Sequence, residues 1–154
     1  MKAVVQRVLD ASVKVDGTLY GSIPRGLLVY LGVARGDTEG DAEKLAKKIA
    51  HLRIFEDGEG KMNLSIGDLP PLDGKKPGIL TVSQFTLLAD TRRGRRPYYG
   101  EAADSGDARR LYEYFMLKIR EGGLPCEAGV FQARMELRYT NDGPVTIILD
   151  SAEL

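Results

Sequence analysis

The segment 27–33, Leu-Leu-Val-Tyr-Leu-Gly-Val, is an almost unbroken apolar run with the length of a β-strand. Such a run is typical of a central strand that is buried on both of its faces. Pro24 and Gly26 stand just before it and mark the entry to the strand. The chain is therefore expected to form a β-sheet with this segment inside it.

Further strands are expected on both sides of this segment. Val4–Val8 and Ser12–Val15 favour β-structure, and Asp16-Gly17 follows them directly. An Asp-Gly pair between two such runs is a strong signal for a type I′ hairpin, so the chain should open with antiparallel strands. Three later segments are also predicted to be strands: Ile79–Ala89, Val130–Tyr139 and Val145–Leu149.

Two segments have the spacing of amphipathic helices. The first follows Thr38, which can cap it together with Asp41, and its apolar face comprises Ala42, Leu45, Ala46, Ile49 and Leu52. The second begins at Asp104 or Ser105 and ends at Gly122-Gly123, with an apolar face of Ala108, Leu111, Tyr112, Phe115 and Ile119. Many strands with two such helices predict an α+β fold, a mainly antiparallel sheet with the helices on one face.

The 154 residues suffice for one domain with a substantial core, so residues 1–154 are expected to fold as a single unit. Hydrophobic residues make up 43% and charged residues 29%, which is ordinary for a globular protein. No apolar run approaches the roughly 20 residues needed to span a bilayer, and the N-terminus lacks the apolar core of a signal peptide. We therefore expect a cytoplasmic protein with no membrane partner.

The chain has one histidine, His51, and one cysteine, Cys126. A Ser-His-Asp or Cys-His catalytic centre has almost nothing to be built from. His51 lies off the apolar stripe of the first helix and is expected to be partly exposed, and Cys126 beside Pro125 is expected to be a packing residue. Neither a metal-ligand set nor a phosphate-binding glycine loop is visible, so no metal and no cofactor are expected.

Positive and negative side chains balance at 22 each, so nucleic acid would have to be bound by a local patch. The segment Thr91–Pro97 is such a patch, with four arginines in five positions: Arg92, Arg93, Arg95 and Arg96. The alternative is a solvated loop, or a loop paired with acidic groups of a partner chain.

Two short polar segments interrupt apolar, strand-like sequence: Ser83-Gln84-Phe85-Thr86 and Asn141-Asp142-Gly143-Pro144-Val145-Thr146. An unpaired polar group in such surroundings costs about 1–3 kcal/mol unless it meets a partner or ligand, so both are candidate sites. The alternative for the first is that Ser83 and Thr86 satisfy strand-end hydrogen bonds while Phe85 packs in the core. The alternative for the second is a turn with an ordinary trans bond before Pro144.

From Met1 to about Leu149 the chain resembles the D-aminoacyl-tRNA deacylases, long called D-Tyr-tRNA deacylases. The resemblance is carried by an ordered set of motifs: Gln6-Arg7-Val8, Gly26-Leu27-Leu28-Val29, Arg53-Ile54-Phe55, Gly60-Lys61-Met62-Asn63-Leu64, Ser83-Gln84-Phe85-Thr86-Leu87, Arg95-Arg96-Pro97 and Asn141-Asp142-Gly143-Pro144-Val145-Thr146. It implies a barrel-like sheet wrapped around a helix, in a homodimer, with tRNA as the partner and no role for DNA.

The resemblance also implies roles for residues. Backbone amides of Ser83–Thr86, near the Gln84-Phe85 step, would act on an ester carbonyl. Gly143-Pro144 would be cis and would hold the substrate α-amino group through its carbonyl oxygens, so that an L-side chain collides with the backbone while a D-side chain points outward. The pocket for the terminal adenosine would be lined by Phe131 and Met135, with Met62 in a secondary role. Gln132 and Tyr98-Tyr99 depart from the usual family residues near the surface that would contact RNA.

The predicted activity is hydrolysis of the ester between a D-amino acid and the terminal ribose of tRNA, with glycine also accepted to some degree. Two mechanisms are open. Either the Thr86 hydroxyl attacks the ester, or the protein supplies oxyanion donors while the 2′-OH of the substrate ribose helps to activate water. The second is favoured because a threonine hydroxyl without a neighbouring base is a weak nucleophile. The rival function is a non-catalytic RNA-binding dimer that uses the arginines of 92–96.

Overall fold

The computed structural model describes all residues from Met1 to Leu154. Its main sheet has six strands: β2 (Thr18–Ile23), β1 (Lys2–Val15), β3 (Gly26–Gly32), β6 (Gly78–Ser83) and β7 (Cys126–Ala128) in that order, with β8 (Glu136–Asp150) paired to β1. The remaining elements are helices α1 (Glu39–Ala50) and α2 (Ser105–Glu121), the hairpin β4 (Phe55–Glu56) and β5 (Met62–Leu64), and the short 3-10 helices η1 (Ile66–Asp68), η2 (Phe85–Leu88) and η3 (Ser151–Glu153).

Strand β1 forms the spine of the sheet. It pairs antiparallel with β3 through its first half, with β2 through its second half, and with β8 along nearly its whole length. Asp16 and Gly17 turn the chain from β1 into β2 with positive φ angles of 48° and 78°, as a type I′ turn requires. The expected antiparallel opening of the chain is confirmed.

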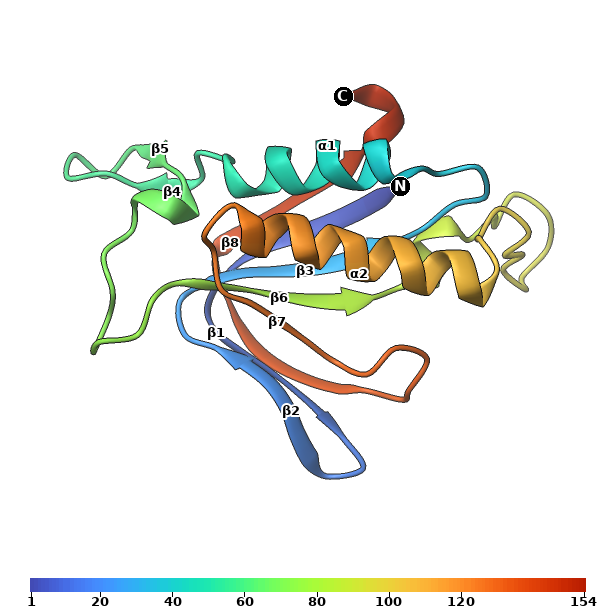
Figure 1. Cartoon of the computed structure of the whole chain (residues 1–154), viewed down its shortest axis with the longest axis horizontal. Helices are drawn as coiled ribbons and strands as arrows, with labels where there is room; N and C mark the ends of the chain where they lie inside the picture. The colour runs from blue at the N-terminus through green and yellow to red at the C-terminus, as the bar shows by residue number, and fades with distance from the viewer.

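The sheet is mixed, because β6 runs parallel to both β3 and β7. Parallel neighbours need a long crossover connection, and helix α1 lies on the first of these crossovers and α2 on the second. The expected antiparallel pattern therefore holds for the three partners of β1 but not for β6. Figure 1 shows the result, with α1 and α2 lying together on one face of the sheet.

Strand β3 is buried on both faces, as its apolar sequence predicts. Leu27, Val29 and Leu31 pack into the larger core beneath the helices, whereas Leu28 belongs to a second core on the opposite face. The second core is enclosed by the curled strands and contains Val8, Ala11, Val13, Ile23, Leu80 and Val82. A methyl group on Gly21 of β2 would lie 2.8 Å from the carbonyl oxygen of Ala128 in β7, so these strands approach and nearly close a barrel.

Both predicted helices are present. Helix α2 lies within a residue of its expected limits, whereas α1 ends at Ala50, so that Leu52, which was predicted on its apolar face, lies beyond the helix. Thr38 and Asp41 form the capping box of α1, and the Asp104 carboxylate accepts from the Gly106 and Asp107 amides at the start of α2. Their buried faces contain the predicted apolar residues Leu45 and Ile49 in α1, and Leu111, Phe115 and Ile119 in α2. Neither helix has the length and apolar character required to cross a membrane.

Three strand predictions were wrong in their limits. The segment predicted as one strand over Ile79–Ala89 leaves the sheet after Ser83, because the chain turns at Gln84 into η2. The segments predicted as strands over Val130–Tyr139 and Val145–Leu149 give a single strand that starts only at Glu136. Strand β8 continues through the polar segment 141–146, which is accommodated by register shifts opposite Gln6–Asp10 of β1. The Gly143-Pro144 bond within it is cis, as the resemblance implies.

Candidate functional site

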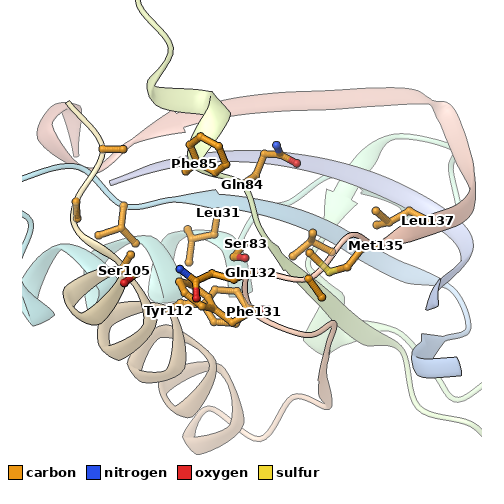
Figure 2. Close-up of a pocket in the computed structure, with 16 residues that line it drawn as sticks. Leu31, Ser83, Gln84, Phe85, Ser105, Tyr112, Phe131, Gln132, Met135 and Leu137 are labelled. Atoms are coloured by element: carbon orange, nitrogen blue, oxygen red, sulfur yellow. The ribbon is translucent and has the colours of Figure 1, made fainter. Parts of the chain in front are cut away.

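The main site candidate is a pocket of about 650 Å³ between the end of β6, the start of α2 and the segment that leads into β8. Of its 16 lining residues 12 are hydrophobic, so it suits a ligand with a large apolar part. Figure 2 shows Gln84 and Phe85 at one end of the pocket and Tyr112 and Phe131 at the other. The lining comprises Leu31, Val33, Val82, Ser83, Gln84, Phe85, Ala102, Ala103, Ser105, Ala108, Tyr112, Phe131, Gln132, Ala133, Met135 and Leu137.

The rim of the pocket is set by the turn from β6 into η2. The Gln84 amide donates to the carbonyl oxygen of Leu31 at 2.8 Å, which extends the parallel pairing by one residue before the chain turns. The next two amides, of Phe85 and Thr86, are the first of η2, and a first helical turn leaves such donors without partners inside the helix. The Phe85 side chain is 58% exposed, so it is not a core residue.

An aromatic wall closes the other end. The rings of Tyr112 and Phe131 are tilted against each other, with centroids 5.9 Å apart, and the Arg109 guanidinium lies 5.2 Å from the Phe131 centroid. The Tyr112 hydroxyl donates to the carbonyl oxygen of Thr81 at 2.7 Å, and burial raises the pKa of Tyr112 well above its usual range. Tyr112 is therefore a fixed, neutral wall rather than an acid.

The pocket lining contains no histidine, cysteine, lysine, arginine or carboxylate. His51 is exposed on α1 and its Nδ1 pairs with the carbonyl oxygen of Lys47 at 2.7 Å, while Cys126 is buried in β7. Burial raises the pKa of the Cys126 thiol. The expectations for both residues are confirmed.

Thr86 lies at the rim but outside the lining. Its hydroxyl oxygen accepts a hydrogen bond from the Gln84 side-chain amide. An amide N–H cannot accept a proton, so this partner does not activate the hydroxyl. No group of three or more His, Cys, Asp or Glu side chains in the molecule is arranged to hold a metal ion.

The arginine cluster forms a loop directly after η2. Asp90 and Tyr98 pair through both backbone amides and close this loop. Arg92 donates to the Asp90 carboxylate at 2.9 and 2.7 Å, which lowers the pKa of Asp90 to about 2. The other three arginines are exposed and form no ion pair within the chain: Arg93, Arg95 and Arg96.

Gly143-Pro144 does not reach the pocket of its own chain. Leu31, which lines the pocket, pairs with Ala3 of β1, whereas Thr146 pairs with Gln6 and the Gly143-Pro144 step lies beyond it. Gly143-Pro144 is therefore separated from Leu31 by at least three residues, roughly 10 Å, in the direction of the strands and by two strand spacings across the sheet. Met62 lies on β5, is 59% exposed and does not line the pocket either.

A buried arginine fixes the backbone beside Gly143. Arg7 is 5% exposed, donates to the carbonyl oxygen of Ile54 at 2.6 Å and places its Nε 3.0 Å from the Asp142 carboxylate. Gly143 has a φ of +118°, and a methyl group there would lie 3.0 Å from Arg7 Nη2 and 2.8 Å from Val145 Cγ2. The conformation and the close packing both require glycine at this position.

The structure thus brings together Ser83, Gln84, Phe85, Phe131 and Met135, which come from two distant parts of the sequence. Sequence reasoning missed Tyr112, which it assigned only to the apolar face of α2. Its helical position gives no sign of the hydrogen bond to Thr81. That partner lies in β6, and the sequence does not predict where β6 lies in the sheet.

Comparison with known proteins gives a consistent result. A family model described as D-Tyr-tRNA(Tyr) deacylase matches residues 4–150. A protein from Koribacter versatilis named D-aminoacyl-tRNA deacylase is 56% identical over 98% of this chain and 97% of its own length, and one of the same name from Thermosipho melanesiensis is 54% identical over 100% and 99%. A solved structure titled c-Myc DNA Unwinding Element Binding Protein is 40% identical, with a TM-score of 0.87 over 97% of this chain and 98% of that one.

Proposed function

Because this chain belongs to the D-Tyr-tRNA(Tyr) deacylase family, we propose that it hydrolyses the ester bond of D-aminoacyl-tRNA and releases the free D-amino acid and tRNA. The observation that carries the proposal is the apolar pocket with an aromatic wall at one end and the first amides of η2 at the other. The base of a nucleoside can enter such a pocket while the esterified ribose stays at the rim.

The terminal adenosine is assigned to the inner part of the pocket. Single-stranded RNA ends are recognised mainly by contacts of their unstacked bases with aromatic and apolar side chains. Phe131 and Tyr112 supply the aromatic surface and Met135 supplies an adaptable apolar one. This placement brings the amino-acid ester to Ser83, Gln84 and Phe85.

The reaction is assigned to water rather than to a protein nucleophile. Water adds to the ester carbonyl carbon, and the negative charge that forms on the carbonyl oxygen is stabilised by the Phe85 and Thr86 amides. The bond between the carbonyl carbon and the 3′ oxygen of the ribose then breaks, and that oxygen leaves with the proton that the attacking water has lost. Activation of the water is assigned to the neighbouring 2′-OH of the same ribose. The reason is that the pocket lining offers no side-chain base.

Selectivity for D-residues is assigned to Gly143-Pro144 of a second copy of the chain. Gly143-Pro144 lies on β8, too far from the pocket of its own chain to act on a substrate there. A homodimer is therefore needed to bring this motif to a pocket. In this arrangement its carbonyl oxygens hold the substrate α-amino group and leave no space for an L-side chain. Glycine has no side chain to exclude, so glycyl-tRNA is expected to be a slower substrate.

The test is a comparison of D-Tyr-tRNA, L-Tyr-tRNA and Gly-tRNA hydrolysis by the same preparation. We expect rapid cleavage of the D-ester, slower cleavage of the glycyl ester and no cleavage of the L-ester above its rate in buffer. Ala108→Trp is the matched control, since Ala108 lines the pocket and an indole there would fill it. Comparable rates on the D- and L-esters would overturn the proposal.

A second candidate function is non-catalytic nucleic-acid binding through the arginine loop. It is favoured by the three arginines without ion pairs, and one similar structure is titled as a DNA unwinding element binding protein.

We propose tRNA rather than DNA as the partner, because substrate-assisted hydrolysis needs a ribose 2′-OH. A cytoplasmic location is proposed as well, in keeping with the single, unpaired cysteine.

A further inference from the structure

A second pocket, of about 490 Å³, lies beside the first. Phe85, Ala102 and Ala103 line both pockets and therefore form the wall between them. The rest of its lining comes from the turn 34–37, from Tyr99 and from the first turns of α2. None of the functions assigned above uses this space.

The aromatic part of the second pocket is open to solvent. The Phe85 ring is 58% exposed and meets the Tyr99 ring edge to face, with centroids 5.0 Å apart and an angle of 67° between the planes. Exposed aromatic rings of this kind stack on bases of single-stranded nucleic acid, largely irrespective of sequence. A ring shared between two neighbouring pockets can serve two neighbouring nucleotides.

The polar part of the pocket has charges of both signs. Its positive group is Arg35, whose Nε donates to the carbonyl oxygen of Ala102 at 3.4 Å and whose backbone amide donates to the carbonyl oxygen of Glu101 at 2.9 Å. Its negative groups are the carboxylates of Asp37, Asp104 and Asp107. Asp37 pairs with the N-terminal ammonium, Asp104 Oδ1 accepts from two amides of α2, and Asp107 keeps a carboxylate exposed beside Arg110. A carboxylate accepts from an exocyclic amino group such as that of cytosine, while a guanidinium donates to a base carbonyl or a phosphate. Uracil has no exocyclic amino group to offer.

We propose that this second pocket holds the cytidine that precedes the terminal adenosine in the single-stranded 3′ end of tRNA. The inference rests on the proposed function, which places that adenosine in the first pocket. It is supported by the continuity of the surface, because the arginine loop closes at Tyr98, one residue before Tyr99. The phosphates of preceding nucleotides would meet the exposed Arg93, Arg95 and Arg96.

The test measures binding separately from hydrolysis, by isothermal titration of adenosine, cytidylyl-adenosine and uridylyl-adenosine. We expect the wild-type protein to bind cytidylyl-adenosine about tenfold or more tightly than adenosine, with uridylyl-adenosine in between. Tyr99→Ala and Arg35→Ala should remove most of this advantage and leave the Kd of adenosine unchanged. Tyr20→Ala is the control, because Tyr20 is also an exposed tyrosine but lies on the distant β2.

Equal affinities of the wild-type protein for adenosine and cytidylyl-adenosine would overturn the inference. So would a Tyr99→Ala variant that weakens adenosine binding as much as dinucleotide binding, since Tyr99 would then act through Phe85 on the first pocket. The proposed function is judged by the D-ester assay alone, and the ratio of the two Kd values tests the second pocket whatever that assay gives.

Discussion

At the scale of single residues, the proposed site depends on main-chain groups more than on side-chain chemistry. The Gln84 amide is occupied by Leu31, which fixes where the chain turns, and the two following amides begin a new helical turn at the pocket rim. Side chains around them shape the space and hold the turn. The Thr86 hydroxyl, which the sequence offered as a possible nucleophile, accepts a hydrogen bond from an amide.

This leads to a prediction that separates the two mechanisms. Thr86→Ala should keep substantial activity, because no base activates the hydroxyl that it removes. A substrate whose terminal ribose carries hydrogen in place of the 2′-OH, with the amino acid on the 3′ oxygen, should react far more slowly. The measurement compares the single-turnover rate of the Thr86→Ala enzyme on the normal substrate with that of the wild-type enzyme on the 2′-deoxy substrate. A dead Thr86→Ala enzyme beside a normally cleaved deoxy substrate, or a trapped acyl-enzyme, would reverse the choice.

Gly143→Ala is expected to damage both stability and selectivity. A side chain at a φ of +118° is strained, and its methyl group would press on Arg7 and Val145. We expect a loss of about 1–3 kcal/mol in the free energy of unfolding and a higher ratio of L- to D-ester cleavage. Thermal melting and the two-substrate assay measure these effects. Gly58→Ala is the control, since a methyl group there would meet no atom within 4 Å.

At the scale of elements, local signals predicted most of the fold. Asp16-Gly17, the Thr38 cap and the Asp104 cap each act within a few residues, so their turn and helices could be placed from sequence. The end of β6 at Ser83 could not, because it depends on a hydrogen bond to Leu31 in another strand. The parallel pairing of β6 likewise follows from how the helices pack, which no local pattern encodes.

The arginine loop should contribute affinity and not chemistry. Arg95→Ala combined with Arg96→Ala is expected to raise KM, to leave kcat nearly unchanged and to lower the slope of log KM against log salt concentration by about 1.4 to 1.8. Arg92→Ala should have a smaller effect, because Asp90 already neutralises that guanidinium. Steady-state kinetics over a salt series test this, and a collapse of kcat at saturating substrate would place the arginines in the reaction.

Cys126 on β7 should resist alkylation in the native protein. Burial raises the pKa of its thiol, so the reactive thiolate is scarcer at pH 8 than it would be for an exposed cysteine. Mass spectrometry after iodoacetamide treatment should show an unmodified native chain and one label after unfolding. Labelling of the native protein at the rate of a free thiol would contradict this account.

At the scale of the whole molecule, the candidate site is divided between distant parts of one chain. The pocket residues predicted from sequence, such as Phe85 and Phe131, do meet, whereas Gly143-Pro144 and Met62 lie elsewhere. Sequence motifs could identify these pieces but not the distances between them, because those distances follow from strand register.

The proposed dimer can be tested by mixing two variants that each lack selective D-ester cleavage, Ala108→Trp with a blocked pocket and Gly143→Ala with a damaged selectivity motif. If the motif acts across the interface, half of the dimers in an equal mixture will contain one intact site, and selective D-ester cleavage should recover to about a quarter of the wild-type value. Activity of the wild-type protein should also fall on dilution below the dimer dissociation constant. A fully active monomer, or no recovery on mixing, would remove the cross-subunit part of the proposal.

The proposed placement of the oxyanion donors in the main chain has a consequence for how this protein tolerates mutation. An amide N–H is present whatever side chain its residue carries, with proline as the exception. Deep mutational scanning should therefore find few substitutions at Phe85 and Thr86 as harmful as proline. Intolerance should instead concentrate at positions that hold the backbone path, such as Gly32, where a methyl group would lie 2.5 Å from Leu88 and 3.0 Å from the carbonyl oxygen of Gln84.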